Sequence, residues 1–451
     1  MKKREKGRPF ASKTLSFISW GIFLLVITQS SCLVTSITPT ITPPPPTITI
    51  TPTTPPSLEG EKYFVDNING NDTYNGTESY PWRSIKKATD TAIAGDTIIV
   101  RGGEYVPPRG GWVFQNSGTQ SQPISFINYP DEQVVLKIQN AENNTYNIFR
   151  CSVNPSHPES WQTPKADYIK IIGTDVPPHF LSNGVESQKG IVMQGLEGAQ
   201  SPAIVASDCD YWEVAGVDFV ETSSGIMDFK NNWHLMEEHS TDYWHVHDNR
   251  VYSFYRESGM QFNGNFNLIE NNEIYKVNNR SDTPYGCQML NLLGNNNIVR
   301  GNTFSRLGSK IECIGLLFEW DLSDANLIEE NTIQDVLVGI ASQGGDGNLI
   351  QNNTITATLN EGKTGVQISS YENRITWPCN DYIGSGGTIE AALPPDNPAH
   401  PDYQYYYNPR NCHSMNNQII ANHISGFRNA WAMIPIEDES NLFLDNIVTG
   451  P

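Results

Sequence analysis

The chain has 451 residues, enough to bury one large core or two ordinary ones. Charged residues make up only 17% of it, glycine numbers 36 and asparagine is frequent, so the composition excludes a mainly helical protein and favours short strands with tight polar turns. The formal net charge of −20 excludes nucleic acid as an expected partner.

Residues 1–32 have the features of a signal peptide that ends in a lipoprotein cysteine. The first 31 residues hold six basic residues and one acidic residue, and the apolar run 22–27 is too short to span a bilayer. The run stops at Ser30-Ser31-Cys32, where small residues precede a cysteine as at a bacterial lipoprotein cleavage site. Gln29 stands where such sites usually carry an aliphatic residue, which keeps simple secretion and an uncleaved anchor as alternatives. We expect an exported monomer, held at the membrane by a lipid on Cys32.

The chain that remains after cleavage is strongly acidic. Without the first 31 residues, 23 basic residues face 48 acidic ones, a net charge near −25. An anionic polysaccharide would be repelled at long range unless Ca²⁺ or a local basic patch bridges the charge, whereas a neutral glycan would not. The charge therefore favours a neutral sugar, or Ca²⁺ as a cofactor.

Two further segments follow the leader. Residues 33–60 are almost wholly Thr, Pro, Ile and Ser, which predicts an extended linker. The folded domain spans residues 61–451, with a strand at Tyr63-Phe64-Val65-Asp66, a short amphipathic helix at 81–88 and a turn and strand at 94–100. This block resembles the N-terminal cap of exported pectate-lyase-like β-helix proteins, in which a helix plugs the open end of the solenoid.

Internal repeats decide the predicted architecture. An asparagine followed two residues later by an apolar residue recurs, with steps of 23, 30, 29, 22, 69 and 24 residues, at Asn249, Asn272, Asn302, Asn331, Asn353, Asn422 and Asn446. A second strand precedes these asparagines, and a third strand of each repeat begins at Gly190, Gly225, Gly259, Gly286, Gly315, Gly339 and Gly365. A unit of this size cannot bury its own apolar face, so the units must stack.

Three short strands per repeat resemble the coil of a right-handed parallel β-helix of the pectate-lyase-like superfamily, from Tyr63 to Pro451. The resemblance implies an all-β solenoid in which the tight-turn asparagines form a ladder, each side-chain amide bonding the next coil. A leucine-rich repeat is excluded because its Leu-x-x-Leu-x-Leu frame is absent. The register breaks once, which predicts an aromatic-rich loop insertion at about 369–416. The chain ends directly after a coil, so we expect a covering partner or a truncated product.

Six cysteines besides Cys32 suit an oxidising compartment, and none forms a Cys-x-x-Cys pair that would suggest zinc. We expect a disulfide between Cys379 and Cys412. Cys287 and Cys313 fall at neighbouring places in successive repeats, where stacked thiols and a disulfide are both open.

The resemblance also implies a glycan groove along one sheet that is flanked by long turns, and the glycine-led strand is its counterpart here. Strand alternation turns Gln261 and Asn263 outward. The same register exposes Gln288, Gln343 and Gln367. We predict that this amide-rich row binds sugar hydroxyls, aided by Trp377 and Tyr405 of the insertion.

Two kinds of polysaccharide cleavage fit the titratable residues. A lyase needs a base, a cation that neutralises a uronate carboxylate, and often Ca²⁺. Lys230, Arg256 or Lys310 would serve as base or cation, and Asp228, Glu319 and Asp321 as Ca²⁺ ligands. A hydrolase needs two carboxyl groups, and Glu319 and Asp321 would lie roughly 6–7 Å apart on one strand. For each residue the alternative is a solvated turn charge.

One further motif is His245-x-His247, which points two imidazoles to one side of a strand and would bind a metal with a third ligand from His234 or His239. Structural histidines are the alternative.

The sequence thus predicts an extracytoplasmic, polysaccharide-active β-helix protein, either a lyase or a glycoside hydrolase. The competing hypothesis is a non-catalytic, glycan-binding or adhesin-like surface solenoid.

Overall fold

The computed structural model describes residues 60–139, 147–152, 163–181, 184–196, 201–228, 241–256, 258–279, 286–319, 323–359, 362–369, 414–434 and 440–450. The chain divides into two units, Met1–Pro56 and Ser57–Pro451, and all of these residues belong to the second. The predicted leader with Cys32, the linker up to residue 59 and most of the aromatic insertion lie outside the described residues. Among the described residues, no helix has the length and apolar character needed to cross a membrane.

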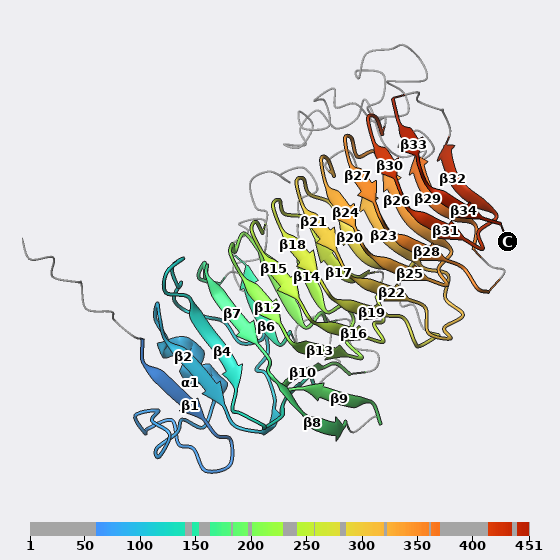
Figure 1. Ribbon diagram of the computed structural model, residues 1–451. Coiled ribbons are helices and arrows are strands. Elements are labelled where there is room, and N and C mark those ends of the chain that lie inside the picture. The colour runs from blue at the N-terminus through green and yellow to red at the C-terminus, as the bar shows by residue number, and fades with distance from the viewer. Residues whose placement is uncertain are drawn as a thin grey trace, which may run out of the picture. The chain divides into compact units, whose positions relative to one another are not determined.

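Nearly all strands belong to three parallel sheets, which the chain visits in turn so that each coil from β4 to β32 adds one strand to each sheet (Figure 1). Sheet 1 contains β1 (Lys62–Val65), β2 (Thr97–Val100), β4 (Ile124–Asn128), β7 (Ile169–Ile172), β12 (Glu213–Ala215), β15 (His245–His247), β18 (Leu268–Glu270), β21 (Ile298–Arg300), β24 (Leu327–Glu329), β27 (Leu349–Gln351), β30 (Gln418–Ile420) and β33 (Leu442–Leu444). Sheet 2 contains β3 (Gly103–Tyr105), β5 (Val134–Lys137), β10 (Ile191–Gln194), β13 (Val217–Val220), β16 (Arg250–Tyr252), β19 (Glu273–Tyr275), β22 (Thr303–Ser305), β25 (Thr332–Gln334), β28 (Thr354–Thr356), β31 (His423–Ser425) and β34 (Ile447–Thr449). Sheet 3 contains β6 (Phe149–Ser152), β11 (Ile204–Ser207), β14 (Ile226–Asp228), β17 (Ser258–Phe262), β20 (Gln288–Leu292), β23 (Ile314–Glu319), β26 (Val338–Gln343), β29 (Thr364–Ser369) and β32 (Asn429–Ile434).

One apolar core lies between the three sheets. Its side chains come from alternate strand positions, because alternation turns every second residue inward. The middle residues of the three-residue strands from β12 to β31 in sheets 1 and 2, such as Val246 and Val251, are buried, as is Phe262 of sheet 3. The predicted parallel β-helix of three strands per coil is confirmed.

The predicted asparagine ladder is confirmed at the turn between sheets 1 and 2. The backbone N–H of Asn249 donates to the side-chain oxygen of Asn272 (3.1 Å), and the N–H of Asn272 donates to that of Asn302 (2.8 Å). The same bond continues through every predicted coil to Asn446. Each side-chain amide also caps a carbonyl oxygen of the preceding coil, so these buried polar groups are satisfied.

A second ladder, which the sequence analysis did not predict, lies where the chain enters sheet 1. Asn267 donates its backbone N–H to the side chain of Asn297 (2.8 Å), and Asn297 donates to Asn326 (2.8 Å). The series goes on through Asn348, Asn417 and Asn441. Each coil from β18 to β33 is therefore fixed to the next at both ends of its sheet 1 strand.

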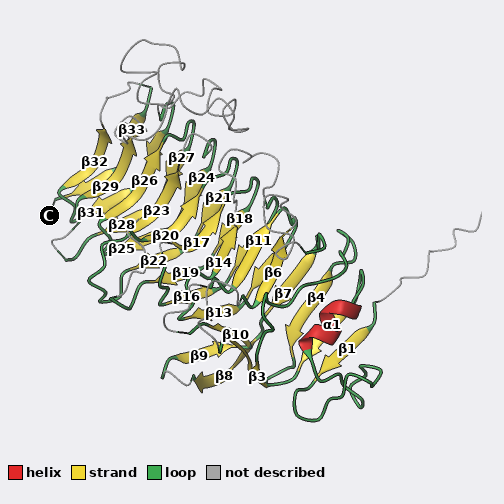
Figure 2. Cartoon of the chain, turned by 180° about the vertical axis from the view of Figure 1, so that it is seen from behind, coloured by secondary structure: helices red, strands yellow, loops and turns green. Residues whose placement is uncertain are grey.

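The helix α1 (Ile85–Thr91) lies at the β1 end of the stack (Figure 2) and contacts β1 and β2. Ser84 caps its N-terminus by accepting the backbone N–H of Lys87 (3.1 Å). Its buried residues Ile85 and Ala88 join the main core. The predicted capping helix is confirmed.

Two register predictions were wrong. The strand after Gly190 is β10, which pairs with β5 and β13 and so belongs to sheet 2. In β20, Leu290 pairs with Met260, so Met289 occupies the position that the sequence analysis gave to Gly286. The connection before β20 is long, and its length let the strand start three residues later than the glycine motif implied.

Disulfides join Cys287 to Cys313 and Cys151 to Cys209. The first settles the choice between stacked thiols and a bond, and the second was not predicted. Cys379 and Cys412 lie outside the described residues.

One antiparallel hairpin departs from the coils. It consists of β8 (Asp175–Phe180) and β9 (Glu186–Lys189). Leu181 next to the hairpin packs with Val192 and Val220, which face outward from sheet 2. The hairpin therefore covers part of the outer face of sheet 2.

Candidate functional site

Sheet 3 is bordered by the long connections of the fold. From β12 onward, each connection from sheet 1 to sheet 2 has one or two residues, whereas those that enter or leave sheet 3 have between three and 48. The predicted arrangement, a glycine-led strand between long turns, is confirmed for β14, β17, β23, β26 and β29 of sheet 3.

The outer face of sheet 3 carries the predicted amide row, in altered form. Register aligns the outward residues Gln261, Asn291, Leu317, Ala341 and Gln367. Gln261 and Gln367 are half-buried. Gln343, which lies two residues after Ala341 on the same strand, is also half-buried. Leu317 and Ala341 are buried in a small apolar cluster with Val338.

Two predicted members of that row lie elsewhere. Gln288 is only 6% exposed and pairs with Ser258 rather than with Gln261. Asn263 follows β17 and is also buried, and its side-chain amide donates to the backbone oxygen of Asp228 (2.9 Å). Asn291 takes the register position that the sequence analysis gave to Gln288, but it is only 1% exposed.

Asp228, one of the predicted Ca²⁺ ligands, ends β14 and is 1% exposed. Its carboxylate accepts hydrogen bonds from the Thr241 hydroxyl and from the backbone N–H of Asn263 (3.0 Å). A predicted metal ligand and a predicted sugar contact therefore bond each other in the interior.

Basic residues recur on the connections that lead from sheet 2 into sheet 3. Arg256 is half-buried, and Lys310, Lys363 and Arg428 are exposed. The sequence analysis had proposed the first two as base or cation. Lys363 and Arg428 directly precede paired strands, since Thr364 pairs with Asn429. Four cations thus lie along one edge of sheet 3 in a chain of strongly negative net charge.

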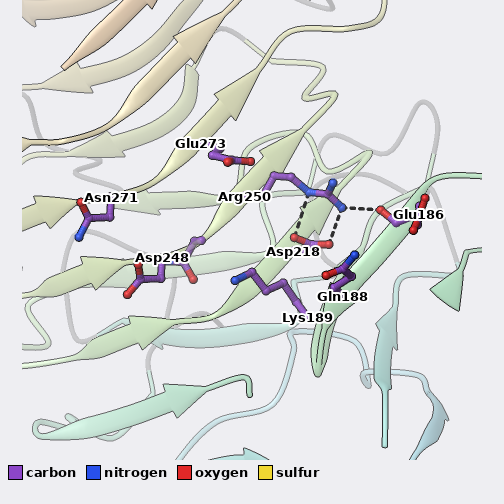
Figure 3. Close-up of a pocket in the computed structure, with 9 residues that line it drawn as sticks. Glu186, Gln188, Lys189, Asp218, Asp248, Arg250, Asn271 and Glu273 are labelled. Carbon is purple, nitrogen blue, oxygen red and sulfur yellow. Dashed lines mark hydrogen bonds and ion pairs between the residues drawn. The ribbon is translucent and has the colours of Figure 1, made fainter. Parts of the chain in front are cut away.

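A separate cleft of about 470 Å³ lies between the hairpin and the outer face of sheet 2 (Figure 3). It is lined by Glu186, Gln188, Lys189, Asp218, Asp248, Asn249, Arg250, Asn271 and Glu273. The lining side chains come from β9, from β13, β16 and β19, and from the tight turns between sheets 1 and 2.

Arg250 organises the cleft. Its guanidinium donates two hydrogen bonds to the Asp218 carboxylate (3.1 and 2.6 Å) and one to the backbone oxygen of Glu186 (2.8 Å), as Figure 3 shows. Asp218 is 1% exposed, so this ion pair is shielded from solvent on the acid side. The lining holds four carboxylates and two cations, a balance that suits a neutral polar ligand better than an anion.

The predicted histidine pair lies on the outer face of sheet 1, and its neighbour is an acid rather than a third histidine. Register places Glu213 of β12 beside His245 of β15. The His247 imidazole holds the pKa of Glu213 at about 2, with help from Lys170, and Glu213 in turn raises the pKa of His247. His234 and His239 lie outside the described residues.

Several other predicted residues lie in parts of the chain that the structure does not describe: Lys230, Asp321, Trp377 and Tyr405, together with the side chain of Glu319. The residues that the sequence analysis missed are Glu213, Asp218, Asn291, Lys363 and Arg428. A search for basic residues just before each sheet 3 strand would have found the last two.

Comparisons with known proteins identify a family for this fold. A family model described as "Pel9A-like, right handed beta helix region" matches residues 63–310, more than half of the chain. The uncharacterized protein YwoF of Bacillus subtilis (strain 168) is 32% identical over 95 residues, which make up 21% of this chain and about a fifth (20%) of that protein.

Solved structures resemble the chain only distantly. A complex of XylC with xylose is 13% identical, with a TM-score of 0.44 and 86% of both chains covered. An alginate lyase from Paenibacillus sp. str. FPU-7 is 13% identical, with a TM-score of 0.40, over 81% of this chain and 92% of that one. A GH136 lacto-N-biosidase from Eubacterium ramulus is 10% identical, with a TM-score of 0.44, over 87% and 68%. These values assign no activity to the chain.

Proposed function

Because the chain belongs to the Pel9A-like right-handed β-helix family, we propose that it acts on an extracytoplasmic, uronate-containing polysaccharide by β-elimination, with the glycan along sheet 3. The observation that carries this proposal is the line of cations at the edge of sheet 3, made by Arg256, Lys310, Lys363 and Arg428. An anionic glycan is repelled by a chain of this net charge unless such a local basic region attracts it.

The reaction assigns different tasks to lysine and arginine. A base removes the proton alpha to the uronate carboxyl group, a double bond forms in the sugar ring, and the bond to the leaving oxygen breaks as that oxygen takes up a proton from water. A cation beside the carboxylate stabilises the negative charge that develops there. Arginine does not deprotonate in proteins, so Arg256 serves as such a cation. Lys310, whose backbone N–H is fixed by the Asn279 side chain (2.6 Å), is the described candidate for the base. Lys230 is the second candidate.

Asp228 is the described residue among the predicted Ca²⁺ ligands whose contacts are known. Its carboxylate is almost fully buried, and Oδ2 accepts the hydrogen bonds from Thr241 and Asn263, so one of its two oxygens is already used within the protein. Ca²⁺ is part of the proposal as a cofactor, and the Ca²⁺ and chelator conditions of the assay below test it. The predicted export, lipid attachment at Cys32 and monomeric state belong to the same proposal.

The purified protein is incubated with a panel of neutral and uronate-containing polysaccharides, with Ca²⁺ or with a chelator. Unsaturated-uronate absorbance and reducing ends are followed in parallel. We expect absorbance to rise with uronate substrates only. Removal of a general base lowers rates by about 10²–10⁴, so Lys310→Ala should lose at least about 100-fold. The matched control is Lys86→Ala, an exposed lysine of α1 that should leave the rate unchanged.

Each other result overturns a stated part of the proposal. Reducing ends without unsaturated product would identify a hydrolase. Retention on an immobilised glycan without any product would favour the non-catalytic binding protein. An unchanged rate in Lys310→Ala would remove that residue as the base and leave Lys230 to be tested in the same way.

A further inference from the structure

A compact set of metal-binding side chains lies on the outer face of sheet 1, away from sheet 3. One ligand atom each from Glu213, His245 and His247 lies within 4.8 Å of the other two. The two imidazoles come from alternate positions of β15 and stack with ring centroids 4.0 Å apart. All three residues are half-buried, so a cation can reach them from solvent.

One edge of the set is an imidazole–carboxylate hydrogen bond with the spacing of two metal ligands, and a bound metal would replace its proton. His247 Nε2 lies 3.3 Å from Glu213 Oε1. In a tetrahedral zinc site with bonds of about 2.0–2.1 Å, two ligand atoms are roughly 3.3 to 3.4 Å apart. A shift of His245 by about 1–2 Å would bring the third ligand atom to the same separation.

The remaining ring nitrogens are held as they are in metal sites. Metal-binding histidines usually donate their other N–H to a carboxylate, which fixes the ring and its tautomer. His247 Nδ1 lies 2.7 Å from an Asp248 carboxylate oxygen. His245 Nε2 lies 2.8 Å from Glu270, which is itself held by Arg300 (2.7 Å). Both histidines therefore have a supporting acid in addition to Glu213.

We propose that Glu213, His245 and His247 form a binding site for a first-row divalent cation of the zinc type, with one coordination position open to solvent. Two imidazoles and a carboxylate suit such metals better than Ca²⁺ or Mg²⁺, which prefer all-oxygen ligands. The site does not depend on the proposed lyase activity, because it lies on a different sheet.

Lys170 competes with the metal for the same acid. Its ammonium lies 2.6 Å from Glu213 Oε2, on the carboxylate oxygen that does not face His247. The cation lowers the negative charge available to a metal without blocking Oε1. Replacement of this lysine by an uncharged residue should therefore strengthen metal binding.

The test titrates ZnCl₂ into the purified protein, free of any polyhistidine tag, and measures heat and stoichiometry by calorimetry. We expect one tight site per chain. Bound Co²⁺ should show the intense visible absorption of tetrahedral nitrogen and oxygen ligands. His245→Ala, His247→Ala and the near-isosteric Glu213→Gln should each weaken Zn²⁺ binding at least about 10-fold. Lys170→Met should strengthen it.

The matched control is His423→Ala, an exposed histidine of β31 on sheet 2, which should bind Zn²⁺ like the wild type. Circular dichroism checks that every variant is folded, and Glu213→Gln tests the site if a histidine variant is not. Absence of a stoichiometric site in the wild type would overturn the proposal. So would equal Zn²⁺ affinity in wild type and Glu213→Gln, or weaker binding in Lys170→Met.

Discussion

At the scale of single residues, a surface ion pair joins Arg101 to Glu132 near the N-terminal cap. Arg101 donates two hydrogen bonds through Nε (3.1 and 2.9 Å) and one through Nη2 (2.6 Å) to the Glu132 carboxylate. The backbone N–H of Gly102 donates to the same acid (2.6 Å). The Arg101 guanidinium, with the Gly102 N–H, holds the pKa of Glu132 below its usual 4.5.

This lowered pKa predicts a pH-dependent contribution to stability. A carboxyl group whose pKa is depressed by folding stabilises the protein above its unfolded pKa, and this stabilisation is lost as the pH falls through the folded pKa. Glu132→Gln should therefore lower the free energy of unfolding by about 1 kcal/mol near neutral pH. The difference from wild type should shrink steadily below about pH 4. Urea unfolding at a series of pH values measures it, and a difference that grows on acidification would contradict this account.

For single residues, the sequence correctly predicted which side chains face outward wherever strand alternation alone decides their direction. Gln261, Gln343 and Gln367 face outward as predicted, because their strands are short and their pairing starts at the same place in each coil. Gln288 failed because Gly286 lies within the 12-residue connection before β20, and Met289 rather than Gly286 is in register with Gly259. Nothing in the sequence marked Asp218 as a site residue, because a buried acid looks the same as an exposed one until its partner Arg250 is placed beside it.

At the scale of elements, the pair of Asp218 and Arg250 ties together β13, β16 and the hairpin strand β9. Removal of one partner from a buried ion pair leaves an uncompensated charge and costs about 3–5 kcal/mol. Arg250→Met should therefore destabilise the protein by about that amount, because Asp218 is almost fully buried. The double variant Asp218→Asn with Arg250→Met should recover most of the loss, as measured by denaturant unfolding. A double variant less stable than Arg250→Met alone would show that the charge left on Asp218 is not the cause.

The coils were predictable as elements and the hairpin was not. From β15 onward, each turn from sheet 1 to sheet 2 has two residues, so its asparagine and the apolar residue that follows keep a fixed spacing. The hairpin contains Pro177-Pro178 and several charges, a composition that is typical of a loop. Its role depends on contacts with Val192 and Val220, which no local pattern in the sequence encodes.

At the scale of the whole solenoid, stability depends mainly on contacts between successive coils. Asn302 lies in the middle of the ladder, where it accepts from Asn272 and donates to Asn331 and to the Ile269 carbonyl oxygen. Asn302→Ala leaves several of these buried groups without partners, each at a cost of about 1–3 kcal/mol. We expect a loss of at least about 2 kcal/mol in urea unfolding.

The matched control is Asn446→Ala in the last described coil. Asn446 accepts from Asn422 (2.8 Å) but is only half-buried, so water can replace part of what is lost. Its substitution should cost less than half as much as Asn302→Ala. Equal losses at the two positions would show that the ladder does not gain its strength from burial.

The whole-molecule prediction from sequence was right about the fold and incomplete about the site. The repeats specify which strands stack, because the same spacing between an asparagine and an apolar residue recurs in coil after coil. A binding or catalytic site needs residues from separate coils, such as Glu213 and His245, which are 32 positions apart and meet only through strand pairing. Lys363 and Arg428 become neighbours in the same way across the long insertion.

The stacking distance of the coils also sets a length scale for any polymer along sheet 3. Neighbouring parallel strands are about 4.8 Å apart, and the strands that follow Arg256 and Arg428 are five steps apart in sheet 3, so these cations are separated by about 24 Å along the stack. Short oligosaccharides could contact only some of the four cations at once. Affinity should therefore increase with degree of polymerisation and reach a plateau once a single oligosaccharide spans all of them.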